Sequence, residues 1–332
     1  MIDPMEPVLH VEGLSLSYDT PTGEVLALRD VNLTIGKGEI VGLVGESGSG
    51  KSTLMQAILQ LMASSARVTA GRILFQGRDL VQMGPTGMQA LLGDRISVVF
   101  QDPMTALNPV LTIGRQMVDI QHRMAGGRST KRQRAIEMLR RVRIPDPESR
   151  MDRYPHEFSG GMRQRIAIAM ALMARPALLV ADEPTTALDA TLEIATINLL
   201  RELQKDIGCA ILFITHHLGV VAELCDRIDI MYAGELVESG PTIPVFRDPR
   251  HPYTQLLFSC DPAQIREATR HLPAIGGNLP DLVDLPEGCI FAPRCPRADD
   301  TCRCRRPVDH RAGQSDLVRC HYPEAPRLEI RP

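Results

Sequence analysis

A nine-residue stretch, Gly45 to Thr53, constrains the fold of this chain more than any other feature. Its sequence, Gly-Glu-Ser-Gly-Ser-Gly-Lys-Ser-Thr, matches the pattern Gly, four residues, Gly-Lys-Ser/Thr, whose backbone N–H groups cradle nucleotide phosphates. The apolar run over residues 39–44 predicts a buried strand before it, and residues 53–59 have the spacing of a helix with one apolar side. Strand, glycine-rich loop and helix together predict a nucleoside-triphosphate site in an α/β fold.

Each residue type in this loop has a chemical reason. Glycines permit backbone torsions that turn successive N–H groups toward a phosphate, and the helix start adds a partial charge of roughly +0.5. Lys51 would neutralise the β- and γ-phosphates, and the Ser52 hydroxyl would complete a Mg²⁺ shell. The nucleotide-binding residues that we expect from this stretch are Gly45, Ser47, Gly48, Ser49, Gly50, Lys51, Ser52 and Thr53.

Composition excludes several classes of protein. The 332 residues include 37 basic and 40 acidic side chains, so the net charge is close to zero. Such a balance does not indicate nucleic acid as a partner. No apolar run approaches the roughly 18 residues of a membrane span. The first residues lack the basic and apolar regions of a signal peptide. We therefore expect a cytosolic protein that is able to dock on a membrane complex.

The pattern along the chain predicts strands that alternate with helices. Alternating apolar residues near 14–18 and 31–35 indicate antiparallel strands at the N-terminus. Helical character runs from about Met104 to Arg165, and the chain becomes proline-rich and irregular after about Gly240. Further strands are expected at residues 72–75, 96–100, 177–181 and 209–214. This alternation implies a mostly parallel sheet covered by helices.

Two carboxylates follow the apolar strand that begins at Ala177. Asp182 is suitably placed to hold Mg²⁺ through water, and Glu183 to polarise an attacking water. General-base help of this kind contributes about 10²–10⁴-fold in rate.

A second anion-binding helix start is predicted at Ser159-Gly160-Gly161, which precedes a long apolar helix and carries no lysine of its own. At this point the sequence resembles the ABC (ATP-binding cassette) ATPases, whose signature reads Leu-Ser-Gly-Gly-Gln. Phe158 stands here for the Leu and Met162 for the Gln, and both changes leave the Ser-Gly-Gly phosphate contact intact.

The resemblance extends to the other cassette elements in their usual order. It implies that Tyr18 stacks on adenine and that Gln101 senses Mg²⁺ and reaches a membrane partner. It implies that Asp189, in Ala187-Leu188-Asp189, belongs to a loop across a dimer interface. His216 matches the switch histidine at the γ-phosphate, although His217 follows it where most members have Asp.

The implied fold is a P-loop ABC ATPase cassette with a RecA-like parallel sheet core, an N-terminal antiparallel β-subdomain and a helical subdomain at about 104–165. We expect this nucleotide-binding domain over residues 1–240 and a small Cys-rich extension over residues 241–332. The resemblance also implies that two cassettes pack head to tail around ATP, so that nucleotide binding and hydrolysis close and reopen the pair. The resemblance then implies catalytic roles for Glu183, His216 and Gln101. It also implies that Mg²⁺ is bound by Ser52, Gln101 and Asp182.

Three stretches resemble the peptide-uptake branch of the family, at residues 101–109, 246–257 and 285–295. The chain is similar to the "D"-type ATPase of dipeptide and oligopeptide permeases. The implied partners are a second, homologous ATPase in a heterodimer, two transmembrane permease subunits and an extracellular or periplasmic peptide-binding protein. The implied location is peripheral, at the cytoplasmic face of the inner membrane. Nickel importers of the same branch are an alternative.

Five of the eight cysteines fall between Cys289 and Cys320. In a reducing cytosol such a cluster favours metal over disulfides. Four thiolates suit a [4Fe–4S] cluster or a tetrahedral zinc ion, and the resemblance to peptide-permease ATPases favours the cluster. The expected ligands are Cys289, Cys295, Cys302 and Cys320, with Cys304 and His321 as spare donors.

Two other classes compete with the importer interpretation. A soluble ABC ATPase of translation usually carries two cassettes in one chain, and one of DNA repair a long coiled-coil or zinc insertion; neither is recognised in this sequence. A recombinase-like P-loop ATPase would not be expected to carry Ser159-Gly160-Gly161 ahead of Asp182-Glu183.

Overall fold

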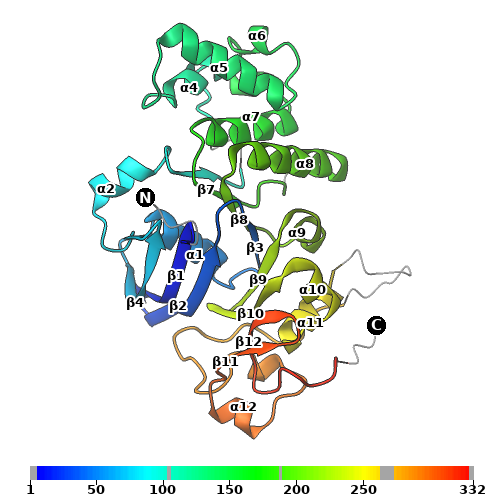
Figure 1. Ribbon diagram of the computed structural model, residues 1–332. Coiled ribbons are helices and arrows are strands. Elements are labelled where there is room, and N and C mark those ends of the chain that lie inside the picture. The colour runs from blue at the N-terminus through cyan, green and yellow to red at the C-terminus, as the bar shows by residue number, and fades with distance from the viewer. Residues whose placement is uncertain (1–5, 103–105, 187–188, 262–272, 329–332) are drawn as a thin grey trace. The chain divides into compact units, whose positions relative to one another are not determined.

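The computed structural model describes residues 6–102, 106–186, 189–261 and 273–328, and the chain divides into two compact units (Figure 1). Unit 1 comprises residues 1–34, 40–82 and 215–332, and unit 2 comprises residues 35–39 and 83–214. Both units contain strands and helices, so each combines an apolar sheet with helices that cover it.

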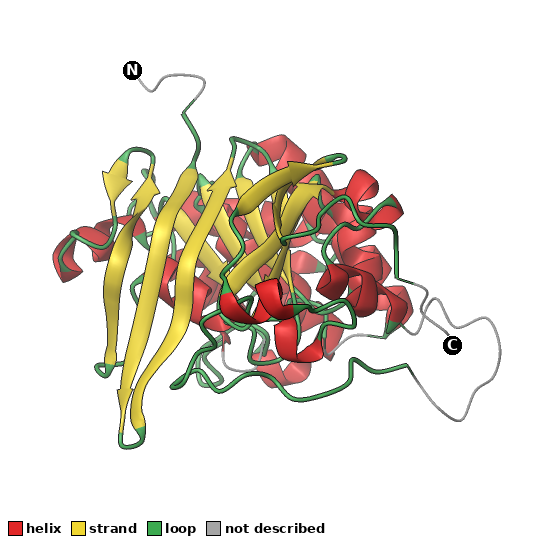
Figure 2. Ribbon diagram, turned by 90° about the horizontal axis from the view of Figure 1, so that it is seen from below, coloured by secondary structure: helices red, strands yellow, loops and turns green. Residues whose placement is uncertain are grey.

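Unit 1 contains an antiparallel sheet with the strand order β2-β1-β4-β5. Its long strands lie side by side in Figure 2. β1 pairs with β4 from Leu9 opposite Phe75 to Tyr18 opposite Ala66. Leu14 and Leu16 are fully buried, which confirms the N-terminal strands expected from alternation. The strands are β1 (Leu9–Thr20), β2 (Gly23–Ile35), β4 (Ala66–Phe75) and β5 (Arg78–Asp79).

A second run of strands in unit 1 has the order β11-β12-β10-β9-β3. β3 (Ile40–Val44) is buried along its whole length and pairs in parallel with β9 (Arg227–Tyr232). β9 in turn pairs antiparallel with β10 (Glu235–Pro241). The helices of this unit are α1 (Lys51–Leu59), α9 (Leu218–Leu224), α10 (Thr242–Arg247), α11 (Pro252–Ser259), η3 (Ala292–Arg294) and α12 (Asp300–Cys304).

The region after Gly240 is more regular than the sequence indicates. It forms α10 and α11, and a hairpin of β11 (Asp309–Ala312) and β12 (Ser315–Arg319) that pairs with β10. The buried Glu238 organises this region, because its carboxylate accepts the N–H groups of Arg250 and His251 and the Ser315 hydroxyl at 2.8–2.9 Å. The expectation of an irregular segment is therefore wrong for these stretches, since contacts distant in sequence order them.

Unit 2 contains three parallel strands in the order β8-β7-β6, with all but the last residue of β7 buried. They are β6 (Ile96–Val99), β7 (Leu178–Asp182) and β8 (Ala210–Ile214), as the apolar runs predicted. Parallel strands buried on both faces read as continuous apolar runs, which is why these were visible in the sequence.

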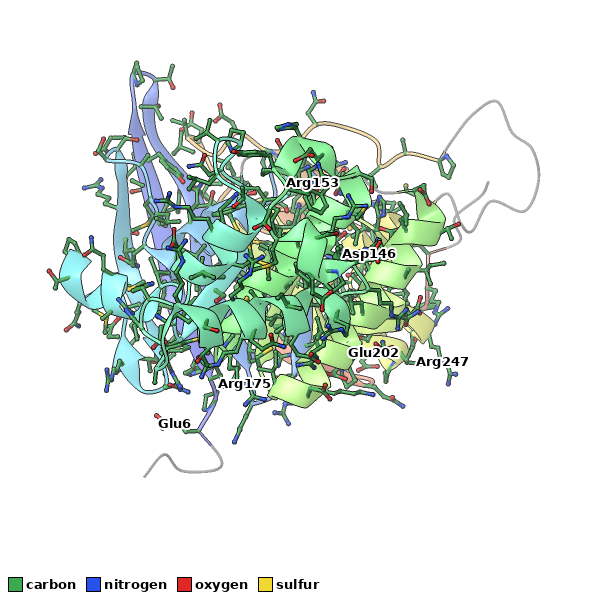
Figure 3. The ribbon with its side chains drawn as sticks, turned by 90° about the horizontal axis from the view of Figure 1, so that it is seen from above. Glu6, Asp146, Arg153, Arg175, Glu202 and Arg247 are labelled. Atoms are coloured by element: carbon green, nitrogen blue, oxygen red, sulfur yellow. The ribbon has the colours of Figure 1, made fainter. Side chains whose placement is uncertain are left out.

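The helices of unit 2 confirm the helical stretch expected up to Arg165. α5 packs against α4, α6 and α7. Asp146, Arg153, Arg175 and Glu202 are among the exposed charged side chains of this unit (Figure 3). The helices are α2 (Pro85–Leu91), α4 (Ile113–Asp119), α5 (Arg128–Arg141), α6 (Pro147–Arg150), η1 (Pro155–Glu157), α7 (Gly160–Met173) and α8 (Ala190–Ile207).

A search of the described residues for membrane spans finds no helix with enough length and apolar character to cross a bilayer.

Candidate nucleotide-binding site

The glycine-rich loop of unit 1 connects β3 to α1 and leaves no room for side chains at two positions. Gly45 has φ 155°, and a Cβ there would lie 2.1 Å from the Met231 carbonyl oxygen. Gly50 has φ 103°, and a Cβ there would lie 3.2 Å from the Ala27 carbonyl oxygen. Glycine fits both the torsion and the space at these positions, so the loop backbone packs directly against the Met231 and Ala27 carbonyls.

The Lys51 side chain folds back beneath this loop. Its exposed fraction is 8%, and its ammonium donates to the carbonyl oxygens of Gly45 at 2.8 Å and Glu46 at 2.9 Å. A third contact reaches the Ser49 hydroxyl at 3.3 Å. Ser52 is exposed in the first turn of α1, and Thr53 beside it is half-buried. A buried cation and a helix start therefore lie at one loop, and these are the groups that bind phosphate.

Tyr18 and His216 are the other predicted nucleotide residues of unit 1. Tyr18 is half-buried on β1, and its hydroxyl lies 3.5 Å from the Gln56 side-chain oxygen on α1. It therefore lies beside the helix that begins at the loop. His216 is exposed, and its ring centroid is 4.5 Å from that of His217 in an edge-on arrangement. The His217 N–H donates to the Thr215 hydroxyl at 3.1 Å, which orders this turn before α9.

Unit 2 brings Gln101 and Glu183 together. The Gln101 side-chain amide donates to the Glu183 carboxylate at 3.0 Å. Asp182 ends β7, and Glu183 follows it with φ 44°, a torsion that is uncommon for a residue with a side chain. The Glu183 N–H donates to the Ile214 carbonyl at 2.8 Å, which fixes this strained turn at the strand end.

Thr186 is a residue that sequence reasoning missed at this carboxylate. Its hydroxyl donates to the same Glu183 oxygen as Gln101, also at 3.0 Å. A hydroxyl three positions after a strand-end acid is too common a pattern to single out in a sequence. The two donors hold the Glu183 carboxylate in one orientation.

The predicted second anion site lies at the start of α7 in unit 2. Ser159 caps this helix, and its hydroxyl accepts the Met162 N–H at 3.3 Å. Ser159 and Gly160 are exposed, whereas Gly161 is buried. Phe158 is 4% exposed with the Arg150 guanidinium 5.7 Å from its ring centroid, so the position requires an apolar side chain and tolerates Phe in place of Leu.

Asp189 forms the N-terminal cap of α8. Its carboxylate accepts the N–H groups of Thr191 and Leu192 at 3.1 and 3.0 Å. The preceding Ala187 and Leu188 of the same motif lie outside the described residues. The cap fixes the direction in which the chain enters α8.

The four predicted cysteine ligands line one small cavity in unit 1, together with His251, Phe291 and His321 among others. Burial raises the pKa of Cys289 to about 12 and that of Cys320 to about 11, so these thiols are protonated in the absence of a cation. Cys304 is exposed. In the described part of the chain, no group of three or more His, Cys, Asp or Glu side chains forms a site that could hold a metal ion.

Two further residues contact the glycine-rich loop and were not expected from the sequence. The Arg294 guanidinium pairs with the Glu46 carboxylate at 2.8 Å, and the Tyr253 hydroxyl accepts the Glu46 N–H at 3.0 Å. No local pattern links residues that lie more than two hundred positions apart, so only the fold reveals these contacts.

Comparison with known proteins finds two families in the chain. Residues 28–186 match the family ABC transporter, and residues 237–302 match the family Oligopeptide/dipeptide transporter, C-terminal region. The chain is 44% identical over 319 residues to the dipeptide transport ATP-binding protein DppD of Escherichia coli (strain K12), which covers 95% of this chain and 97% of DppD. It is 45% identical over 327 residues to the oligopeptide transport ATP-binding protein OppD of Bacillus subtilis (strain 168), covering 97% and 91%.

Solved structures show the same cassette fold. The cbiO1 protein of Clostridium perfringens, part of the ABC transporter complex cbiONQ, matches with a TM-score of 0.64 and 31% identity over 73% of this chain and 92% of its own. The ATP-binding cassette MJ0796, solved as a post-hydrolysis dimer bound to ADP and phosphate, matches with a TM-score of 0.62 and 29% identity over 70% and 98%. From its glycine-rich loop to its C-terminal region, the chain belongs to the ABC transporter ATPases, in the branch of the dipeptide and oligopeptide transport ATP-binding proteins.

Proposed function

We propose that this chain is the ATP-hydrolysing subunit of an ABC importer for dipeptides or oligopeptides. One observation carries the substrate class: a cassette match and a peptide-transporter C-terminal match occur in one chain, over residues 28–186 and 237–302. Relatives that cover 95–97% of the chain are named for dipeptide and oligopeptide transport, which favours peptides over nickel.

The residues of this chain fit ATP with Mg²⁺. The loop carries glycine at Gly45 and Gly50, where its backbone packs closely against neighbouring strands, and the buried Lys51 ammonium supplies the positive charge that phosphates require. We propose that the other residues of the phosphate loop, between Gly45 and Thr53, bind the triphosphate and that Tyr18 stacks on the adenine. Ser52, Gln101 and Asp182 would hold Mg²⁺, which neutralises charge on the phosphates.

Glu183 is the proposed general base for the attacking water. Its carboxylate is oriented by Gln101 and Thr186, each at 3.0 Å, so it is held ready to accept a proton. His216 would donate to the γ-phosphate as bond cleavage proceeds. Their combined effect is to position the water and to stabilise the charge that develops on the transferred group.

A second, homologous ATPase would complete the site as a heterodimer. Ser159, Gly160 and Gly161 would be offered to the nucleotide of that partner, and Asp189 would lie at the shared interface. The solved cassette MJ0796 is a dimer, which supports the pairing of two cassettes. Two permease subunits and a peptide-binding protein would complete the importer. This chain would then lie at the cytoplasmic face of the inner membrane. The proposal includes no nucleic-acid partner.

Within the chain, we propose a nucleotide-binding domain over residues 1–240, with its helical subdomain at about 104–165, and a C-terminal extension over residues 241–332. We propose that Cys289, Cys295, Cys302 and Cys320 hold a [4Fe–4S] cluster. The four thiols line one cavity and are of the donor type that such a cluster, or zinc as the alternative, requires, although their placement in the described residues does not itself form a metal site. When bound, the group would add positive charge that stabilises the thiolates and would staple the extension.

Copurification tests this function. Tagged chain from native membranes should bring down two permease subunits and a second ATPase, and the binding protein of the same system should carry a peptide. Association with ribosomes or DNA would replace the importer by a soluble ABC ATPase of translation or repair. A binding protein that carries nickel would contradict the peptide substrate but not the role of this chain as an importer ATPase.

A further inference from the structure

Glu46 of the phosphate loop is held at three points. Its N–H donates to the Tyr253 hydroxyl at 3.0 Å, and its carbonyl oxygen accepts from the Lys51 ammonium at 2.9 Å. Its carboxylate pairs with both terminal nitrogens of Arg294, at 2.8 and 3.1 Å. A bidentate pair fixes orientation as well as distance, so backbone and side chain of this loop residue are both restrained.

Arg294 is itself rigidly placed. Its side chain is 4% exposed, whereas that of Glu46 is 29% exposed. The guanidinium also donates to the carbonyl oxygens of Gly276 at 2.9 Å and Ile275 at 3.0 Å, and it lies 5.6 Å from the Tyr232 ring centroid. The guanidinium thus contacts one carboxylate, two carbonyls and an aromatic ring, and these contacts together hold it in place.

Both external partners of Glu46 come from the C-terminal region. Tyr253 lies in the first turn of α11, and Arg294 directly precedes Cys295. An aromatic cluster links them, because the Phe291 ring centroid is 5.1 Å from that of Tyr232 and 5.4 Å from that of Tyr253. Phe291 also lines the cysteine cavity. One packed cluster therefore connects this cavity to the loop.

The same region covers another part of the loop. A Cβ on Gly48, which has φ 79°, would lie 3.1 Å from a terminal carbon of Leu279. Leu279 follows closely on Ile275 and Gly276, whose carbonyl oxygens Arg294 binds. The C-terminal region therefore contacts the loop at Glu46 and approaches it at Gly48 through Leu279. This region lies outside residues 28–186, which match the cassette family.

We propose that the C-terminal region acts as a clamp on the phosphate loop, with Arg294 and Tyr253 as positioning residues that hold Glu46. The clamp keeps the loop in the conformation that receives ATP, so nucleotide affinity depends on a segment to which we assign no ATP-binding residue. The inference rests on the proposed ATP site. Its physical basis is preorganisation: a loop that is already ordered loses less conformational freedom when the ligand binds.

The test measures binding of Mg²⁺–ATP to the full chain and its KM and kcat for ATP. Arg294→Met and Glu46→Gln should each weaken ATP binding about tenfold and raise KM, with kcat changed less than about threefold, because the loss is in ground-state order. The double variant should bind ATP no more weakly than Arg294→Met, since both changes remove one interaction. Tyr253→Phe, which deletes only the hydroxyl, should weaken binding by a smaller factor.

Arg303→Met is the matched control. Arg303 lies in the same cysteine-rich segment but is exposed and pairs with Asp300, so its loss should leave ATP binding unchanged. The clamp is refuted if Arg294→Met and Glu46→Gln bind ATP like wild type, or if their effects add in the double variant. If Arg294→Met does not fold, Glu46→Gln still tests the clamp, because Gln is isosteric with Glu and the Glu46 side chain is partly exposed. If the wild-type chain binds no ATP, the proposed ATP site is wrong. This outcome differs from failure of the clamp, in which the wild type and both variants bind ATP equally well.

Discussion

Lys51 is an ammonium buried beneath its own loop, in contact with two backbone carbonyls and a hydroxyl. We predict that Lys51→Ala abolishes detectable ATP hydrolysis, because the charge that develops on the γ-phosphate then lacks the ammonium that Mg²⁺ alone does not replace. Phosphate release from the assembled transporter measures this. Lys37→Ala, which removes an exposed lysine, is the control and should leave the rate unchanged. Hydrolysis by the Lys51 variant would show that the assigned phosphate site is wrong.

Glu183 combines a positive φ with a carboxylate bound by two donors, a strained arrangement that is typical of a functional position. Glu183→Gln should still bind ATP but hydrolyse it about 10²–10⁴-fold more slowly, because the amide cannot accept the proton of the attacking water. We expect a long-lived closed dimer, detectable by size-exclusion chromatography with ATP. Glu202→Gln, at an exposed ion pair with Arg143, should behave like wild type. Normal turnover by the Glu183 variant would remove this residue from the role of base.

Among the elements, α11 begins at a buried histidine with an unusual protonation behaviour. Burial lowers the pKa of His251 to about 3, and its neutral ring accepts the Tyr253 N–H at 3.0 Å. In the unfolded chain the ring binds a proton near the ordinary pKa of 6.5. Between these values the unfolded state holds more protons than the folded state, so the free energy of unfolding falls as the pH falls from about 6.5 toward 3.

The prediction is that thermal midpoints of the wild type decline over this acid window and that His251→Asn shows a flatter decline. Asn can still accept the N–H at the helix start but does not titrate there. His310→Asn, at an exposed histidine of β11, is the control and should keep the wild-type slope. Equal slopes for all three proteins would exclude His251 as a source of the acid sensitivity.

Elements were predictable from the sequence where their cause is local. The β3 run, the glycine loop and Asp182-Glu183 at the end of β7 each follow from neighbouring residues, and the structure has them at the expected places. The C-terminal helices and hairpin were not predictable, because Glu238 orders them through Arg250 and Ser315. The same limit applies to the Glu46–Arg294 pair, whose members lie 248 positions apart.

For the whole molecule, the nucleotide residues are distributed over both units. The phosphate loop, Tyr18 and His216 belong to unit 1, whereas Gln101, Asp182, Glu183 and the Ser159 helix belong to unit 2. In the proposed heterodimer the Ser159 helix is offered to the nucleotide of the partner, so ATP would hold the two cassettes together. ATP can close this pair of cassettes only if it binds the closed arrangement more tightly than the open one.

The cysteines of the C-terminal region provide a test of how this part of the chain is held together. Anaerobically purified chain should contain iron and absorb in the visible region, because four thiolates around one cavity match the ligands of a [4Fe–4S] cluster. Cys302→Ser, a change at the cavity, should lose the iron, whereas Cys304→Ser, at an exposed cysteine, should retain it. Iron removal should also lower the thermal midpoint, since the cavity thiols come from segments separated in sequence and the group would hold them together. Bound zinc without iron would overturn the cluster, and equal iron in both variants would overturn the ligand set.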